Sequence, residues 1–316
     1  MPQPENYSTP IAVTRSGSVN PNWPTRTPFS RHDPAGGNTY VLGLLQTWRR
    51  ELGIADSTTA EGFQQAIAAT RNMLGRAATV SFANGVIVRQ QLDLDVRIVN
   101  HTGHKLPSGF PSRRMWLQVT VVDAAGELLF ESGAADERGY LAVDGRDLAP
   151  HCLALAKPDG FDNADCFEPH RQTITGPGQV AIYEAVMADS NQHIVYSLLY
   201  GAGYLKDNRI PPAGFASNNP AFDPATASVG VAADWDFNLE LGKQGSGSDT
   251  VHYRILLPAG AGPVSVRAKL WYQSIRPAFV AALANAGGKS ERMRLMYREQ
   301  PPLPELLDEQ ALDLRP

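Results

Sequence analysis

The chain has 316 residues and a formal net charge of −4 at neutral pH. Hydrophobic residues make up 43% of it and charged residues 19%, which is typical of a globular protein and excludes a disordered one. The mild acidity, with no basic run longer than two residues, argues against nucleic acid as a partner. No apolar stretch approaches the roughly 18 residues that a membrane span requires.

The first 76 residues divide into two stretches of different pattern. Residues 1–38 are rich in Pro, Asn, Ser and Thr without a periodic apolar pattern, so we predict an extended lead-in that is poorly ordered in isolation. Beyond it apolar side chains recur at helical spacing, and the run Thr-Thr-Ala-Glu at 58–61 has the form of a capping box. These signals predict a helical hairpin over residues 39–76.

From residue 79 the apolar period changes to two. Apolar and polar residues alternate over 92–98 and 117–121, and the turn at 123–126 indicates a hairpin. Further strands are expected near 179–187, 192–200, 250–257 and 263–273.

Short strands between turn-rich loops, in a chain with 28 Gly and 24 Pro, are typical of an immunoglobulin-like antiparallel β-sandwich. We expect this sandwich over residues 79–275, with long loop insertions near 132–178 and 201–248. Pro277 is expected to open a short helix, so residues 276–316 are predicted to be a C-terminal helix and tail. The predicted fold class is therefore mainly β, with a helical hairpin before the sandwich and a short helix after it.

The two cysteines, Cys152 and Cys166, lie on either side of a loop rich in Pro, Gly and Asp. A disulfide closing this loop is expected and would indicate an oxidising compartment, with two separate buried thiols as the alternative. Zinc is not expected, because the spacing to neighbouring histidines matches no common zinc pattern. The acidic loop 159–165 offers oxygen atoms to calcium, or is simply solvated, and it does not follow the EF-hand pattern.

Motifs of common enzyme classes are missing. The sequence contains no nucleophile elbow, no His-Glu-x-x-His motif, no phosphate-binding glycine loop and no dinucleotide fingerprint. The chain is therefore not expected to be an enzyme in its own right.

Three segments stand out as candidates for function: 31–38, 100–114 and 205–215. In the second, Gly and Pro at high density fix an irregular backbone and hold His101 and His104 on a stiff loop. A stiffly held neutral imidazole is a good ligand for a transition metal or for haem iron, and a hydrogen bond within the loop is the alternative role.

Three arginines belong to the second and third segments: Arg113, Arg114 and Arg209. Their planar guanidinium groups are suited to bidentate pairs with carboxylates. The partners could be loop carboxylates or haem propionates.

The run from His101 to Leu117 resembles a motif of the form T-G-H-x-x-P-[ST]-G-[YF]-P-x-R-R, which follows the last haem-binding site in many bacterial multihaem c-type cytochromes. Arg31-His32 followed by Gly-Gly-Asn at 36–38 resembles the R-H-x-F-x-G-G-N element of that family, with Pro34 at the usual aromatic position. Other runs similar to this family lie at 168–170, 180–187, 205–209 and 269–274.

The resemblance covers about residues 25–285, and it has one large departure. No Cys-x-x-Cys-His motif is present, so covalent attachment of haem c within these residues is impossible. The N-terminus does not have the form of a signal peptide. Because Met1-Pro2 matches the continuation of a Cys-x-x-Cys-His-Met-Pro motif, one hypothesis is that this sequence starts directly after the last haem motif.

The resemblance implies a haem-free portion of an exported multihaem cytochrome in electron transfer, periplasmic or extracellular, with haem c bound outside this segment. It would pack against an upstream haem-bearing domain or cytochrome subunit and serve a redox partner protein. His32 and His104 are the implied axial ligands of haem iron, with His170 a third candidate. His104 is preferred to His101 because it occupies the motif's own position, and Arg31 joins the three arginines above as a candidate for propionates or for loop stabilisation.

Two other functions fit the residues. A stand-alone exported module could bind a protein or a glycan with its long loops, and its histidines would then be hydrogen-bonded within those loops. A metal-dependent enzyme could use His101, His104 and a loop carboxylate, but it needs three convergent ligands and an open coordination position.

Overall fold

The computed structural model describes residues 9–10, 12–26, 35–55, 57–154, 157, 161–284 and 287–316. It divides into two units, Met1–Gly36 and Gly37–Pro316. The smaller unit contains one antiparallel pair of short strands, β1 (Thr9–Pro10) and β2 (Thr25–Arg26). Arg31 and His32 lie outside the described residues, and the elements below all belong to the larger unit.

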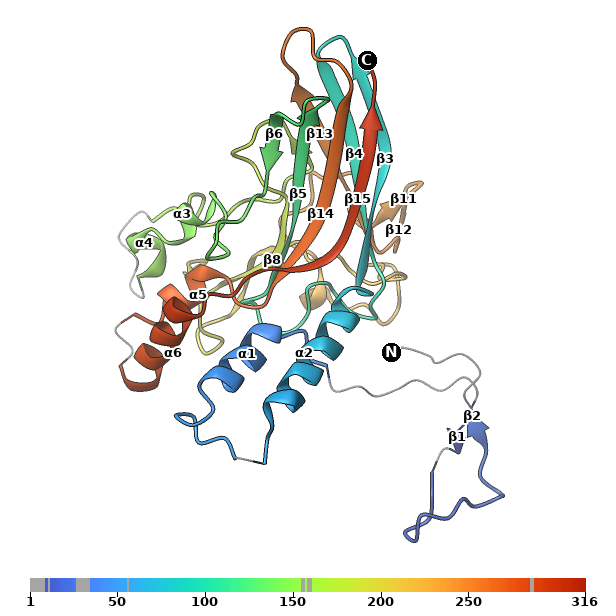
Figure 1. Cartoon of the computed structure of the whole chain (residues 1–316), viewed down its shortest axis with the longest axis vertical. Coiled ribbons are helices and arrows are strands. Elements are labelled where there is room, and N and C mark those ends of the chain that lie inside the picture. Colours follow the sequence, from blue (N-terminus) through green and yellow to red (C-terminus); the bar gives the residue numbers. More distant parts are fainter. Residues whose placement is uncertain are drawn as a thin grey trace. The chain divides into compact units, whose positions relative to one another are not determined.

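Two helices precede the sandwich, as predicted. Helix α1 (Thr39–Thr47) begins where the Asn38 side chain accepts a hydrogen bond from the Val41 amide, and α2 (Ala60–Leu74) begins where Thr59 accepts one from Gly62. The two helices lie side by side at one end of the sandwich (Figure 1). Their buried apolar side chains are Tyr40 and Leu44 in α1 and Phe63, Ile67 and Leu74 in α2.

The sandwich consists of two sheets. The first has the order β10 (Gly203–Asp207), β8 (Ile182–Ala188), β5 (Arg114–Asp123), β14 (Val264–Gln273) and β15 (Glu305–Leu314), with β6 (Leu128–Ser132) on β5 and β9 (Ile194–Val195) on β8. The second has the order β3 (Ala78–Val88), β4 (Gln91–Asn100), β13 (Ser248–Leu256) and β7 (Thr173–Ile174). Strand pairing in these sheets is antiparallel except between β13 and β7.

The core lies between the sheets and follows the alternation seen in the sequence. In β4 the alternating apolar residues Leu92, Leu94, Val96 and Ile98 are fully buried, and the residues between them are partly exposed. Their counterparts in β5 and β14 are also buried, and burial of each such side chain contributes roughly 1.5–3 kcal/mol. The mainly β antiparallel sandwich with flanking helices is therefore confirmed.

Several elements differ from the prediction. Strand β15 was not predicted, and it pairs with β14 along most of its length. Residues 192–200 contain only the two-residue β9, after which the chain turns at Ser197–Tyr200. The C-terminal region has two helices, α5 (Pro277–Ala281) and α6 (Gly288–Glu299), where one was expected.

The two regions predicted as long loops, 132–178 and 201–248, are not wholly irregular. Strands β7 and β10 of the sheets lie within them. They also contain α3 (Asp144–Asp147), α4 (Pro150–Leu153), the 3₁₀ turn η1 (Pro224–Thr226), β11 (Leu239–Glu240) and β12 (Lys243–Gln244). None of the helices in the described ranges combines the length and the apolar character that a bilayer span requires.

Candidate functional site

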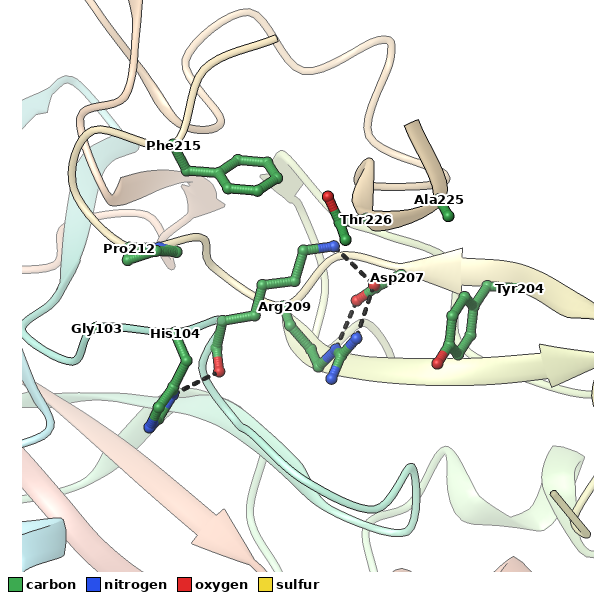
Figure 2. Close-up of a pocket in the computed structure, with 10 residues that line it drawn as sticks. Gly103, His104, Tyr204, Asp207, Arg209, Pro212, Phe215, Ala225 and Thr226 are labelled. Carbon is green, nitrogen blue, oxygen red and sulfur yellow. Dashed lines mark hydrogen bonds and ion pairs between the residues drawn. The ribbon is translucent and has the colours of Figure 1, made fainter. Parts of the chain in front are cut away.

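Two of the three segments singled out in the sequence lie against each other. The segment 100–114 connects the end of β4 to the start of β5, and the segment 205–215 begins in β10 and continues beyond it. Their backbones pair between Leu106 and Ile210, with both N···O distances at 2.9 Å. Together with β10 they line an open pocket of about 380 Å³ (Figure 2). Residues 208–215 are thus a structural partner of the loop that carries His104.

Asn100, the last residue of β4, holds the two loops together. Its side chain is 3% exposed. The Nδ2 group donates to the carbonyl oxygens of His104 at 2.8 Å, Ile210 at 2.9 Å and Pro211 at 3.1 Å. Its Oδ1 accepts from the amide and the hydroxyl of Thr102, both at 2.8 Å. A buried side chain with this many partners fixes the backbone on which His104 lies.

The His104 ring is exposed, and its contacts indicate which ring nitrogen carries the proton. Nδ1 is 3.1 Å from the carbonyl oxygen of Lys105, and a carbonyl oxygen can only accept. This contact favours the tautomer of the neutral ring with the proton on Nδ1, which leaves the Nε2 lone pair available. Within the described part of the chain Nε2 has no hydrogen-bond partner, and the ring points away from Asp207 and Arg209 (Figure 2).

His101, the other histidine of this loop, is placed differently. Its Nε2 is 2.9 Å from the Thr79 hydroxyl, so the nitrogen that would face a metal is already engaged. Both histidines are exposed, but only His104 presents Nε2 outward with Nδ1 bound to the backbone.

The floor of the pocket is an ion cluster. The Lys105 ammonium is 2.7 Å from Asp207, and the Arg209 guanidinium contacts both carboxylate oxygens of Asp207 at 2.6 and 2.8 Å. Burial alone would raise the pKa of Asp207, but Arg209 and then Lys105 hold it below its ordinary value. Two cations against one carboxylate leave one net positive charge among these three side chains.

The arginines of the 100–114 segment have different surroundings. Arg114 is 1% exposed and makes a bidentate ion pair with Asp144, and its Nε donates to Gln273 at 2.9 Å. Arg113 is half-buried and hydrogen-bonds the Tyr272 hydroxyl, which donates to the Gly37 carbonyl oxygen at 2.7 Å. Arg114 thus stabilises a loop, while Arg113 lies beside the Gly-Gly-Asn element.

His170 is enclosed, with a side chain that is 5% exposed. Its Nε2 is 2.7 Å from Asp234, and its Nδ1 faces the Nδ2 group of Asn208 at 2.9 Å. The Asn208 amide is oriented by Ile182 and Glu184, so Nδ1 accepts and Nε2 donates to Asp234. Both ring nitrogens are therefore used within the protein, so neither is free to bind a haem iron.

Asp249 lies close to this pair, and the three residues have ligand atoms within 4.8 Å of one another. A metal on His170 would have to bind at Nε2, which would require the ring proton to move to Nδ1. Asn208 presents an N–H group there and cannot accept that proton. The arrangement does not suit a metal ion.

Cys152 and Cys166 form a disulfide with a Cα–Cα distance of 5.5 Å, and both residues are fully buried. His151 is close to the two sulfur atoms, but sulfur atoms joined in a disulfide do not act as thiolate ligands. Of the acidic loop 159–165, the described part is mostly exposed, and Asp162 accepts from the Ala164 amide at 2.9 Å. No cluster of three possible metal ligands occurs among its described residues.

Comparison with known proteins adds one distant likeness. No protein-family model matches the chain, and no curated protein matches it. A penta-haem cytochrome c552 from Thermochromatium tepidum is similar in structure, with a TM-score of 0.34 and 16% sequence identity. The alignment covers 77% of this chain and 41% of that cytochrome, so the chain spans less than half of the cytochrome's length. At this distance the function has to be argued from the residues themselves.

Proposed function

We propose that this chain is a haem-packing portion of a multihaem c-type cytochrome that takes part in electron transfer. In this proposal His104 supplies an axial ligand to a haem held by an upstream domain or a partner subunit. The observation that carries it is the His104 ring, which lies on a pinned loop with Nδ1–H bound to the Lys105 carbonyl and Nε2 exposed. Histidine ligands of metals are commonly oriented by such a bond from the other ring nitrogen.

The residues around His104 fit a haem. Bound haem would supply the electron-accepting iron, and its two propionates carry negative charge. The Lys105 and Arg209 side chains of the adjacent pocket leave one positive charge in excess over Asp207. Phe110 of the same loop is 43% exposed and packs edge-on against Phe279, so part of its ring is available to an apolar group. This chain's own part is to hold the ligand, exclude water and attract the anionic groups.

Two elements of the proposal rest on the sequence resemblance. His32 is proposed as a second axial ligand by its place in the R-H-x-F-x-G-G-N-like element. An exported location, periplasmic or extracellular, agrees with the disulfide between Cys152 and Cys166 because disulfides persist in oxidising compartments. A redox partner protein completes the proposal.

Haemin titration followed by optical spectroscopy tests the ligand. We expect a low-spin spectrum with the wild-type chain that His104→Ala loses and His101→Ala keeps. His101→Ala is the matched control because it removes an exposed histidine from the same loop.

An unchanged affinity and spectrum in His104→Ala would show that His104 is not the ligand. Absence of binding, both by this chain and by the chain expressed together with its upstream coding region, would favour the stand-alone binding module.

A further inference from the structure

We infer that Asn100 and Thr102 are positioning residues that hold the His104 imidazole in the tautomer protonated at Nδ1. The inference rests on the proposed function in one respect: the tautomer is useful because it leaves Nε2 free for iron. The tautomer of the His104 ring can itself be measured without haem.

Asn100 is the fixed point of this arrangement. Its backbone amide donates to the Gly247 carbonyl oxygen at 2.8 Å at the end of the β4–β13 pair. Three carbonyl oxygens surround its Nδ2, and the Thr102 amide faces its Oδ1, so the side-chain amide has a single allowed orientation. Asn100 therefore presents an acceptor, and not a donor, to the Thr102 hydroxyl.

The Thr102 hydroxyl links the Asn100 side chain to the His104 ring. Its Oγ1 is 2.8 Å from Asn100 Oδ1 and 2.9 Å from the His104 carbonyl oxygen. Both atoms are acceptors, so the single hydroxyl proton is directed at one of them and a lone pair remains for His104. Nδ1 of His104 lies 3.1 Å from this hydroxyl oxygen, which accepts its proton.

Two acceptors, the Thr102 hydroxyl and the Lys105 carbonyl, thus share the Nδ1 proton of His104. In the opposite tautomer the Nδ1 lone pair would face the lone pairs of the Lys105 carbonyl. Acceptors on Nδ1–H also raise the basicity of Nε2, which strengthens the bond to a metal. Asn100 and Thr102 act only through His104, so they position the ligand and do not themselves bind.

His101 provides the contrast within the same loop. Its Nε2 contacts the Thr79 hydroxyl, which can donate or accept according to how it rotates. No carbonyl oxygen among the described residues is hydrogen-bonded to this ring, so its tautomer is not determined in the same way.

The first test needs no haem. Nitrogen-15 NMR of the folded chain, with histidine labelled and the His104 signals assigned by His104→Gln, distinguishes protonated from unprotonated ring nitrogens. We expect Nδ1 of His104 to be protonated and Nε2 not. Thr102→Val should reduce the population of this tautomer, and Thr102→Ser should keep it. A wild-type His104 protonated at Nε2, or no change in Thr102→Val, would overturn the inference.

The second test uses haemin as the probe with the same variants. We expect Thr102→Val to weaken haemin binding by about tenfold or more, and Thr102→Ser to stay within about twofold of wild type. Thr102→Ala replaces the valine variant if circular dichroism shows that the latter is unfolded. Haemin binding through His104 that is equal in wild type and Thr102→Val would contradict the positioning role.

The two measurements separate the inference from the proposed function. Suppose that Thr102→Val loses the Nδ1–H tautomer and that the wild-type chain binds no haemin. This combination would uphold the positioning role of Thr102 and count against His104 as a haem ligand. Haemin binding that depends on His104 but not on Thr102 would do the reverse.

Discussion

At the scale of single residues, several basic side chains that look suited to a ligand form ion pairs inside the protein. Arg114, Lys206 and Arg276 are each 1% exposed. Arg276 contacts Glu184 at 2.8 Å and Asp147 at 3.2 Å, and Lys206 contacts Glu184 at 3.1 Å. Breaking such a pair leaves an uncompensated charge in a poorly solvated place, which costs more than the pair itself contributes.

Arg114→Met tests this structural role. Because the variant leaves the buried Asp144 without its cation, we expect the free energy of unfolding to fall by about 3–5 kcal/mol in urea denaturation. Arg138→Met is the matched control, since Arg138 pairs with Asp136 at the surface and should change stability by less than about 0.5 kcal/mol. In the double variant Arg114→Met/Asp144→Leu we expect at least half of the loss to be recovered. A small effect of Arg114→Met would mean that the pair is dispensable for folding.

The sequence predicted part of the site, and the limit has a physical reason. His104 and its stiff loop follow from local composition and from the motif. The roles of Asn100 and Thr102 do not, because they depend on carbonyl oxygens such as that of Ile210, 110 residues away from Asn100. The spacing of apolar residues along the sequence indicates which face of a strand is buried, but it does not predict contacts between distant loops. The run Asn-His-Thr-Gly-His at the end of a predicted strand was the one available signal.

At the scale of elements, strands with one apolar face were predictable and strand β15 was not. In β4 each alternate residue from Leu92 to Ile98 is apolar and buried, so the period of two is clear. In β15 the sequence is rich in Glu, Asp, Gln and Leu, residues of low or moderate strand propensity, and only Leu307 is fully buried. Its strand conformation comes from pairing with β14, which local sequence does not report.

Leu307→Ala tests whether β15 is part of the core. Leu307 is 4% exposed and belongs to the main hydrophobic cluster between the sheets. We expect the variant to lose about 2–5 kcal/mol of unfolding free energy in urea denaturation, because a cavity remains where the side chain packed. Leu303→Ala, at a position that is 60% exposed just before the strand, should change it by less than about 0.5 kcal/mol. Equal effects of the two variants would place β15 outside the core.

At the scale of the whole molecule, the larger unit combines an apolar sandwich core with a second, ionic interior. The ionic interior is formed by β5, β8, β10, α3 and the residues before α5, and its members are Arg114, Asp144, Asp147, Glu184, Lys206 and Arg276. Burial raises the pKa of Asp147 to about 7, with Arg276 opposing and Glu184 adding to the shift. The net charge of this ionic interior therefore changes as the pH passes through about 7.

This pKa predicts how the contribution of Asp147 to the stability of the molecule changes with pH. Asp147 keeps its proton in the folded chain up to about pH 7, whereas in the unfolded chain it loses the proton near its ordinary value of 3.8. Between these values the folded state binds more protons, so the contribution of Asp147 to stability is lost as pH rises, by up to about 1.4 kcal/mol per pH unit. Carboxyls with lowered pKa values, such as Asp95 and Asp207, are ionised in both states above pH 5 and add no slope there.

We therefore expect the stability of Asp147→Asn, measured by urea denaturation at pH 5, 6, 7 and 8, to rise relative to that of wild type as pH increases. Asparagine keeps a side-chain oxygen for Arg276 but cannot titrate, so the variant lacks the part of the downward slope that Asp147 contributes. Asp136→Asn is the control, because the pKa of this exposed carboxyl lies below its ordinary value and it stays ionised over the whole range. Parallel pH profiles for wild type and Asp147→Asn would show that Asp147 is already ionised in the folded chain at pH 5, and that Arg276 outweighs burial in setting its charge.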